Sequence, residues 1–183
     1  MSIFDKHGKF NGRELEYVSL YLDSEGKNNK ISWVQRFEKE VVEKIGVKYA
    51  IACNSGTSGL HMALAACSIG PGDEVIMPGL TVIMDVYVVI HMGATPIFVD
   101  VNRATYSINP LEIKNKITDK TKAIITVSLQ GLSADMDPIL ELAKERGIIV
   151  IDDSAQNMQG EYKGRIAGSL ADISVFSFEN KKH

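Results

Sequence analysis

The chain has 183 residues, of which 45% are hydrophobic, so it can bury the core of one ordinary domain but not comfortably of two. Its net charge is −3, with lysines and carboxylates interspersed, which excludes the basic stripe of a nucleic-acid binder and the polybasic cluster of a membrane-surface binder. No histidine or cysteine spacing fits a metal site. The two cysteines, Cys53 and Cys67, lie in apolar surroundings, which is typical of buried reduced thiols in a cytosolic protein.

Neither a signal segment nor a membrane-spanning helix is predicted. The opening residues, MSIFDKHGKF, have no apolar core of the kind that a secretion signal needs. The longest apolar stretch, TVIMDVYVVIHMGATPIFV, is interrupted by Asp85 and His91. We therefore expect a cytoplasmic protein.

Residues 1–30 are polar and are expected to form an N-terminal arm and loop, followed by one domain over 31–183. A helix is predicted over WVQRFEKEVVEKIG, with Val34, Phe37 and Ile45 among the apolar residues of one face and Gly46 at its end. Strands are predicted over 48–54, 74–79, 95–101, 123–129, 147–154 and 172–178. Between them lie helical stretches in SGLHMALAAC, around 82–92, and in PILELAKERG. This alternation indicates an α/β fold with a mostly parallel sheet and helices on both faces.

Because ligands of such sheets bind beyond the carboxyl ends of the strands, the strand ends are the places to search for chemistry. The first predicted strand runs into Asn54-Ser55-Gly56-Thr57-Ser58-Gly59 and then into a helix. A small turn with glycine, followed by free helix-start amides, can hold a phosphate. It matches neither a Walker A loop nor a full Gly-x-Gly-x-x-Gly pattern, so ATP and NAD are poorly supported. The alternative is a plain capped helix start, with Ser55 or Thr57 as the cap.

Two later strand ends carry charge. The strand at 147–151 ends in Asp152-Asp153-Ser154-Ala155-Gln156, and adjacent residues there point to opposite faces, so at most one carboxylate faces a given site. Such a carboxylate can bind a sugar hydroxyl, a metal or a protonated ring nitrogen, or can simply cap a turn. The last strand runs into Ser177-Phe178-Glu179-Asn180-Lys181-Lys182, where a lysine is either an amine nucleophile or a solvated tail.

Taken together, the three strand ends provide what pyridoxal 5′-phosphate (PLP) requires. The turn at Gly56 can hold the phosphate, and a carboxylate can keep the pyridine nitrogen protonated. A lysine can carry the cofactor and move protons. No one of the three features indicates PLP by itself.

The chain resembles the DegT/DnrJ/EryC1/StrS family of sugar aminotransferases, which have the fold type I architecture. The resemblance extends from about residue 13 to 183. It is carried by KYAIACNSGTSGLHMAL, GPGDEVIMPGLT, GATPIFVDV, TKAIITVSLQGLSADMDPI, VIDDSAQ and GSLADISVFSF followed after three residues by lysine. It implies the large, PLP-binding domain of a fold type I transferase over 31–183. Family members are roughly twice as long, so the resemblance implies a truncated chain that lacks the small C-terminal domain.

The resemblance also implies roles for individual residues. Asp153 matches the position that pairs with the pyridinium nitrogen, Asp152 replaces the usual glutamate, and Lys182 matches the Schiff-base lysine, with Lys181 as its neighbour. Gln156 is expected near the ring hydroxyl. The phosphate would be held by Gly56, Thr57, the Ser58 backbone and the Ser177 hydroxyl.

Two positions depart from the family pattern. Val82 stands where many members stack an aromatic residue on the cofactor ring, and Ser128 stands where histidine is common. A dehydratase branch replaces the lysine with histidine, and Lys182 argues against that branch.

The function implied is a PLP-dependent aminotransferase that moves an amino group from an amino acid, expected to be glutamate, to a nucleotide-linked keto sugar. The pathway would be deoxyamino-sugar, lipopolysaccharide O-antigen or antibiotic-sugar biosynthesis, and the partner would be a second copy that shares its active sites. The alternatives are a sugar dehydratase of the same family and an inactive regulatory or assembly homologue.

Overall fold

The computed structural model describes residues 12–24, 32–158 and 160–179, and the chain divides into two units. One unit runs to Lys44 and adds Lys48–Ala52. The other consists of Ile45–Val47 and the chain from Cys53 onward.

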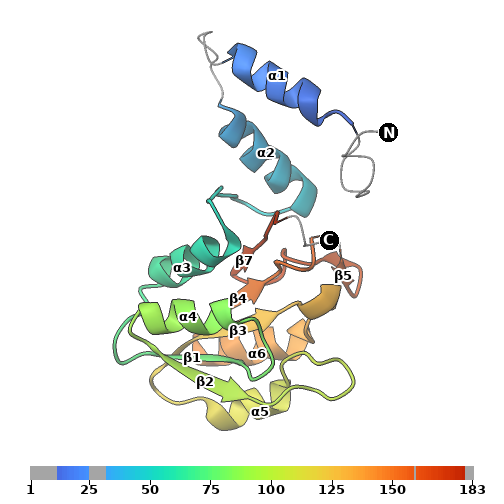
Figure 1. Ribbon diagram of the computed structural model, residues 1–183. Coiled ribbons are helices and arrows are strands. Elements are labelled where there is room, and N and C mark those ends of the chain that lie inside the picture. The colour runs from blue at the N-terminus through green and yellow to red at the C-terminus, as the bar shows by residue number, and fades with distance from the viewer. Residues whose placement is uncertain (1–11, 25–31, 159, 180–183) are drawn as a thin grey trace. The chain divides into compact units, whose positions relative to one another are not determined.

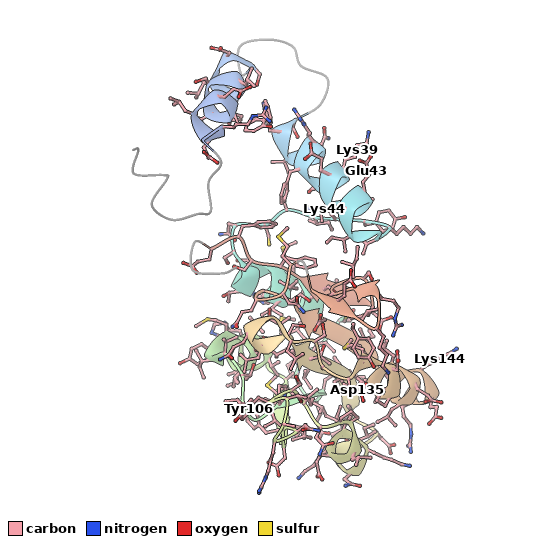
Figure 2. The ribbon with its side chains drawn as sticks, turned by 90° about the vertical axis from the view of Figure 1, so that its right-hand side faces the viewer. Lys39, Glu43, Lys44, Tyr106, Asp135 and Lys144 are labelled. Carbon is pink, nitrogen blue, oxygen red and sulfur yellow. The ribbon has the colours of Figure 1, made fainter. Side chains whose placement is uncertain are left out.

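The first unit contains two helices, α1 (Glu14–Ser24) and α2 (Trp33–Ile45). The α2 helix confirms the prediction from its apolar face, and Lys39 lies 3.8 Å from Glu43 along it (Figure 2). The α1 helix falls in the stretch for which an arm and loop were expected. Its apolar residues Leu15, Val18 and Leu22 do have helical spacing, a signal that the polar composition around them masks.

A parallel sheet forms the centre of the second unit, which confirms the predicted α/β architecture. Its strands are β1 (Glu74–Pro78), β2 (Thr95–Val99), β3 (Thr121–Val127), β4 (Ile149–Asp153) and β7 (Ile173–Val175). They lie in the order β2-β1-β3-β4-β7, and all the pairings are parallel.

Helices cover both faces of this sheet (Figure 1). On one face, α3 (Gly56–Ala66) and α4 (Ile83–His91) bury Leu60, Leu64 and Val88 against the sheet. On the other, α5 (Pro110–Lys116) and α6 (Met136–Arg146) bury Ile113 and Ile139. The chain passes from β1 to β2 through α4 and then back across the sheet to β3 through α5. Right-handed crossovers in opposite directions place their helices on opposite faces, as observed.

Local sequence explains where the helices of this unit begin and end. Asn109 caps α5 by accepting a hydrogen bond from the Leu111 N–H (3.1 Å), and Pro110 follows at the first helical position. The α6 helix ends at Gly147, whose φ of 64° is a left-handed conformation that glycine adopts readily. In the part of the chain that the structure describes, no helix has the length and apolar character needed to cross a membrane.

The structure corrects the predicted strand over 48–54. No described residue pairs with this segment in a sheet, and the side chains of Tyr49 and Ile51 are 72% and 73% exposed. Its β-branched and aromatic content predicted a strand, but a strand needs a partner for its backbone groups. The last strand is also shorter than predicted, because its neighbour β4 ends at Asp153, opposite Val175.

A short hairpin, β5 (Glu161–Tyr162) with β6 (Arg165–Ile166), lies between β4 and β7. Its turn consists of Lys163 and Gly164, both with positive φ, which is the geometry of a tight two-residue hairpin. The hairpin contacts the start of α6. Lys163 Nζ lies 2.8 Å from Asp137, and the Tyr162 hydroxyl donates to Asp135, which is labelled in Figure 2.

Candidate active site

The carboxyl ends of the parallel strands and the beginning of α3 meet at one edge of the sheet. The Phe176-Ser177 segment follows β7 directly, and it lies beside the first residue of α3. A Cβ atom added to Gly56 would stand 3.4 Å from the Cβ of Ser177 and 3.8 Å from the carbonyl oxygen of Phe176. These are ordinary van der Waals distances, so the helix start lies directly beside the segment that follows β7.

Ser55 caps α3. It adopts an extended backbone, and its hydroxyl accepts a hydrogen bond from the Ser58 N–H (3.1 Å). The Ser55 hydroxyl also donates to the Ser58 hydroxyl (3.0 Å). Helix geometry leaves the N–H groups of Gly56 and Thr57 without intrahelical acceptors. The helix start can thus offer these two amides to an anion, whereas the amide of Ser58 is engaged by the cap.

The two adjacent aspartates at the end of β4 lie on opposite faces of the sheet. Asp153 lies two residues after Ile151 and therefore on the same face of the sheet, and Ile151 belongs to the core under α3 and α4. Asp152 lies two residues after Val150 and so shares its face, and Val150 belongs to the core under α5 and α6. Both side chains are buried. Asp153 therefore shares its face with the α3 helix start, and Asp152 does not.

The surroundings of the two carboxylates also differ. The Asp153 carboxylate accepts a hydrogen bond from the Ala155 N–H (2.9 Å), which fixes its orientation. The Asp152 carboxylate accepts hydroxyl hydrogen bonds from Thr126 (2.7 Å) and Ser154. Burial raises the pKa of Asp152 above its ordinary value, while the two hydroxyl bonds act in the opposite direction.

Gln156 and Ser177 also lie at this edge. The Gln156 side-chain oxygen accepts a hydrogen bond from the backbone N–H of Gln130 (2.9 Å), in the loop that follows β3. Ser177 contacts the α3 start, as described above, and its hydroxyl accepts from the Glu179 N–H (3.4 Å). The structure thus brings Gly56, Asp153 and Ser177 to one face and edge. Lys181 and Lys182 lie outside the described residues.

A polar pair in the segment after β1, the half-buried Thr81 and the buried Asp85, was not among the predicted site residues. Thr81 donates a hydrogen bond to Asp85, which is fully buried in the first turn of α4. A hydroxyl four residues before an acid, across a helix start, is the only sequence signal for this pair. Val82 lies between them as the residue that precedes α4.

The described residues fit PLP. The start of α3, with two amides that lack intrahelical acceptors and the Ser177 hydroxyl beside it, suits a phosphate. The buried Asp153 suits a cationic ring nitrogen, because a buried carboxylate is most stable beside an opposite charge.

Comparison with known proteins agrees with this geometry. The model of the DegT/DnrJ/EryC1/StrS aminotransferase family matches residues 10–183. The chain is 46% identical over 171 residues to a GDP-perosamine synthase of Escherichia coli O157:H7, covering 93% of this chain and 47% of that protein. The chain therefore spans about half the length of the curated relatives it matches.

Solved structures of aminotransferases share the fold. The aminotransferase from Psychrobacter cryohalolentis superimposes with a TM-score of 0.88 at 42% identity, over 94% of this chain and 44% of that one. The PLP form of the putative sugar aminotransferase Spr1654 from Streptococcus pneumoniae gives a TM-score of 0.83 at 30% identity, over 90% of this chain and 46% of that one. The fold is thus that of the fold type I PLP aminotransferases. The chain belongs to the DegT/DnrJ/EryC1/StrS aminotransferase family, whose cofactor is PLP.

Proposed function

We propose that the protein is a PLP-dependent aminotransferase that moves an amino group from glutamate to a keto sugar linked to a nucleotide. The observation that carries this proposal is the meeting of the α3 start, Ser177 and Asp153 on one face at one edge of the sheet. The nucleotide-linked sugar as substrate class is supported by the similarity to a GDP-perosamine synthase.

In this proposal the phosphate would be held by Gly56, Thr57, Ser58 and the Ser177 hydroxyl, with the amides of Gly56 and Thr57 as the principal donors. Asp153 stays ionised and holds a proton on the ring nitrogen. Gln156 would be placed near the ring hydroxyl. When bound, PLP supplies an electron sink for the carbon that loses a proton.

Lys182 is assigned two tasks in this proposal. It carries the cofactor in the resting enzyme, and it then takes the proton from the α-carbon of the amino donor as a general base. Lys181 takes no part in either task.

The wider setting belongs to the same proposal. Residues 31–183 form the PLP-binding large domain, after an N-terminal segment over 1–30. The enzyme works in the cytoplasm as a homodimer with shared active sites. It acts in deoxyamino-sugar synthesis for a lipopolysaccharide O-antigen or an antibiotic sugar.

The test uses the full-length protein, with PLP and then glutamate. We expect the wild type to show the absorbance band of the lysine-bound cofactor, and glutamate to convert it to the absorbance of the aminated cofactor. Lys182→Ala removes the band, and Lys181→Ala, the matched control, retains it. A wild-type protein that shows neither the band nor a response to glutamate contradicts the aminotransferase proposal.

A further inference from the structure

A row of polar side chains, of which Thr126 and Asp152 are buried and Ser174 is half-buried, lies on the face of the sheet opposite to the candidate site. Strand register pairs Thr126 with Asp152, and Asp152 with Ser174. Thr126 and Asp152 lie two residues after Ile124 and Val150, respectively, and so share their face. Ile124 and Val150 belong to the core under α5 and α6. None of the three residues in this row is among those proposed to contact PLP.

Asp152 links three segments of the chain through this row. One carboxylate oxygen accepts from the Thr126 hydroxyl on β3 (2.7 Å), and the other accepts from the Ser154 hydroxyl in the turn after β4. The Ser154 backbone N–H donates to the Asp152 carbonyl (3.0 Å), and Ser154 is fully buried. The position of Ser154 is therefore fixed twice by Asp152.

The turn that Asp152 fixes also sets the direction of the Asp153 carboxylate. Ala155 follows Ser154 directly, and its N–H is the donor to the Asp153 carboxylate (2.9 Å). On the other side, the Ser128 N–H donates to the Asp153 carbonyl (3.0 Å). Since Ala155 moves with Ser154, a change at Asp152 reaches the carboxylate of Asp153 through a chain of hydrogen bonds.

We infer that Asp152 is a positioning residue of the cofactor site, which acts through Thr126 and Ser154 to hold the Asp153 carboxylate in place from the opposite face of the sheet. This inference rests on the proposed function. Burying a carboxylate in an apolar core costs free energy that a hydrophobic residue of similar size does not cost. The hydrogen bonds that Asp152 accepts offset this cost, and they are the function that we assign to it. The hydrogen bonds, rather than the charge, carry the positioning, so asparagine can replace aspartate.

The experiment measures PLP affinity and the pH dependence of the bound cofactor's absorbance in the full-length protein. Asp152→Leu and the double variant Thr126→Val with Ser154→Ala are expected to weaken PLP binding by about tenfold to a hundredfold, the range known for outer-shell partners of metal ligands. Both variants also shift the pH profile of the absorbance, because the Asp153 carboxylate no longer holds its direction toward the ring nitrogen. Asp152→Asn retains both properties of the wild type.

Thr121→Val is the matched control, because Thr121 is a buried threonine at the opposite end of the same strand, and its hydroxyl accepts a hydrogen bond from the Thr118 N–H (3.0 Å). It is expected to lower the melting temperature without changing PLP affinity. If Asp152→Leu does not fold, the PLP affinity and the pH profile of the double variant test the inference. Wild-type affinity and an unchanged pH profile in the variants that fold overturn the inference. Failure of the wild type itself to bind PLP contradicts the proposed function instead.

Discussion

Asp152 and Asp153 are neighbours in sequence, yet the structure gives them different chemical environments. Asp153 lies on the face of the α3 start and is oriented by the Ala155 N–H. Asp152 lies on the far face between the hydroxyls of Thr126 and Ser154. The alternation of side chains in β4 is sufficient to separate their roles.

Asp152 also predicts a pH dependence of stability. Burial raises its pKa in the folded state above the ordinary value of 3.8, so the folded protein binds a proton there more tightly than the unfolded chain does. Stability is therefore highest below pH 3.8 as far as this group is concerned, and it falls as pH rises toward the raised pKa, by at most about 1.4 kcal/mol per pH unit.

Asp152→Asn removes this contribution. The free energy of unfolding, measured by urea denaturation at a series of pH values, is expected to be higher for Asp152→Asn than for the wild type near neutrality. The two curves converge at acid pH. A variant that is less stable than the wild type by the same amount at every pH contradicts the account.

Gly168 is required by its backbone conformation and by the ring of Phe176. Its φ is 83°, and an added Cβ would come within 2.1 Å of the Phe176 ring. Gly147 also has a positive φ but has no heavy atom within 4 Å of an added Cβ. Gly147→Ala is expected to cost about 1 kcal/mol of stability for the left-handed backbone alone.

Gly168→Ala is expected to cost about 1–3 kcal/mol more than Gly147→Ala, because the ring or the backbone must move. Chemical denaturation of both variants measures the difference. Equal losses would mean that Phe176 is free to move away, and that it does not fix the segment leading to Ser177.

At the scale of elements, the β5–β6 hairpin is held to the start of α6 by exposed charges. Hydrogen bonds from Lys163 and Arg165 lower the pKa of Asp137. The stabilisation of the hairpin is therefore present above the ordinary carboxyl pKa and is lost as pH falls through the lowered one. Because Asp137 is exposed, salt also weakens the interaction.

Asp137→Asn is expected to release the hairpin with little effect on the core. Hydrogen exchange should become faster at the Ala167 N–H, which donates to the Gly160 carbonyl beside the hairpin (2.8 Å). Exchange in β3 and β4 stays unchanged and is the internal control. Uniform acceleration across the sheet would show that the charge cluster supports the whole unit.

Sequence patterns predicted the elements that carry a periodic apolar face or a continuous apolar run, such as α2, α3 and β3. They did not predict α5 or the β5–β6 hairpin. The α5 helix has seven residues, too few for a periodic apolar stripe, although Asn109 and Pro110 mark its start. The strand predicted over 48–54 is absent because backbone pairing depends on a partner and not on composition.

The structure places Gly56, Asp153 and Ser177 at one edge, although the strand predicted to lead into Gly56 is not formed. Their roles in binding the cofactor stay predictions. Alternation alone showed that only one aspartate faces a site, and the choice of Asp153 came from the family resemblance. The hydroxyl contacts of Asp152 were not predicted, since nothing in a linear sequence pairs Thr126 with a residue on the next strand. Lys182 remains a prediction.

At the scale of the whole molecule, the parallel sheet explains why residues far apart in the chain form one site. Each crossover returns the chain to the same edge, so the ends of β4 and β7 and the beginning of α3 gather there although they come from distant parts of the sequence. Family membership and the PLP-form neighbours agree with that arrangement.

The most direct test of the account compares Asp153→Asn with Asp152→Asn in the full-length protein by PLP affinity and by the half-reaction with glutamate. We expect Asp153→Asn to weaken PLP binding by about tenfold to a hundredfold, as loss of a buried charge-assisted hydrogen bond does, and to abolish the half-reaction. Asp152→Asn is expected to change the affinity by about twofold or less. The opposite order, or equal effects of the two substitutions, would contradict the assignment of the site to the α3 face of the sheet.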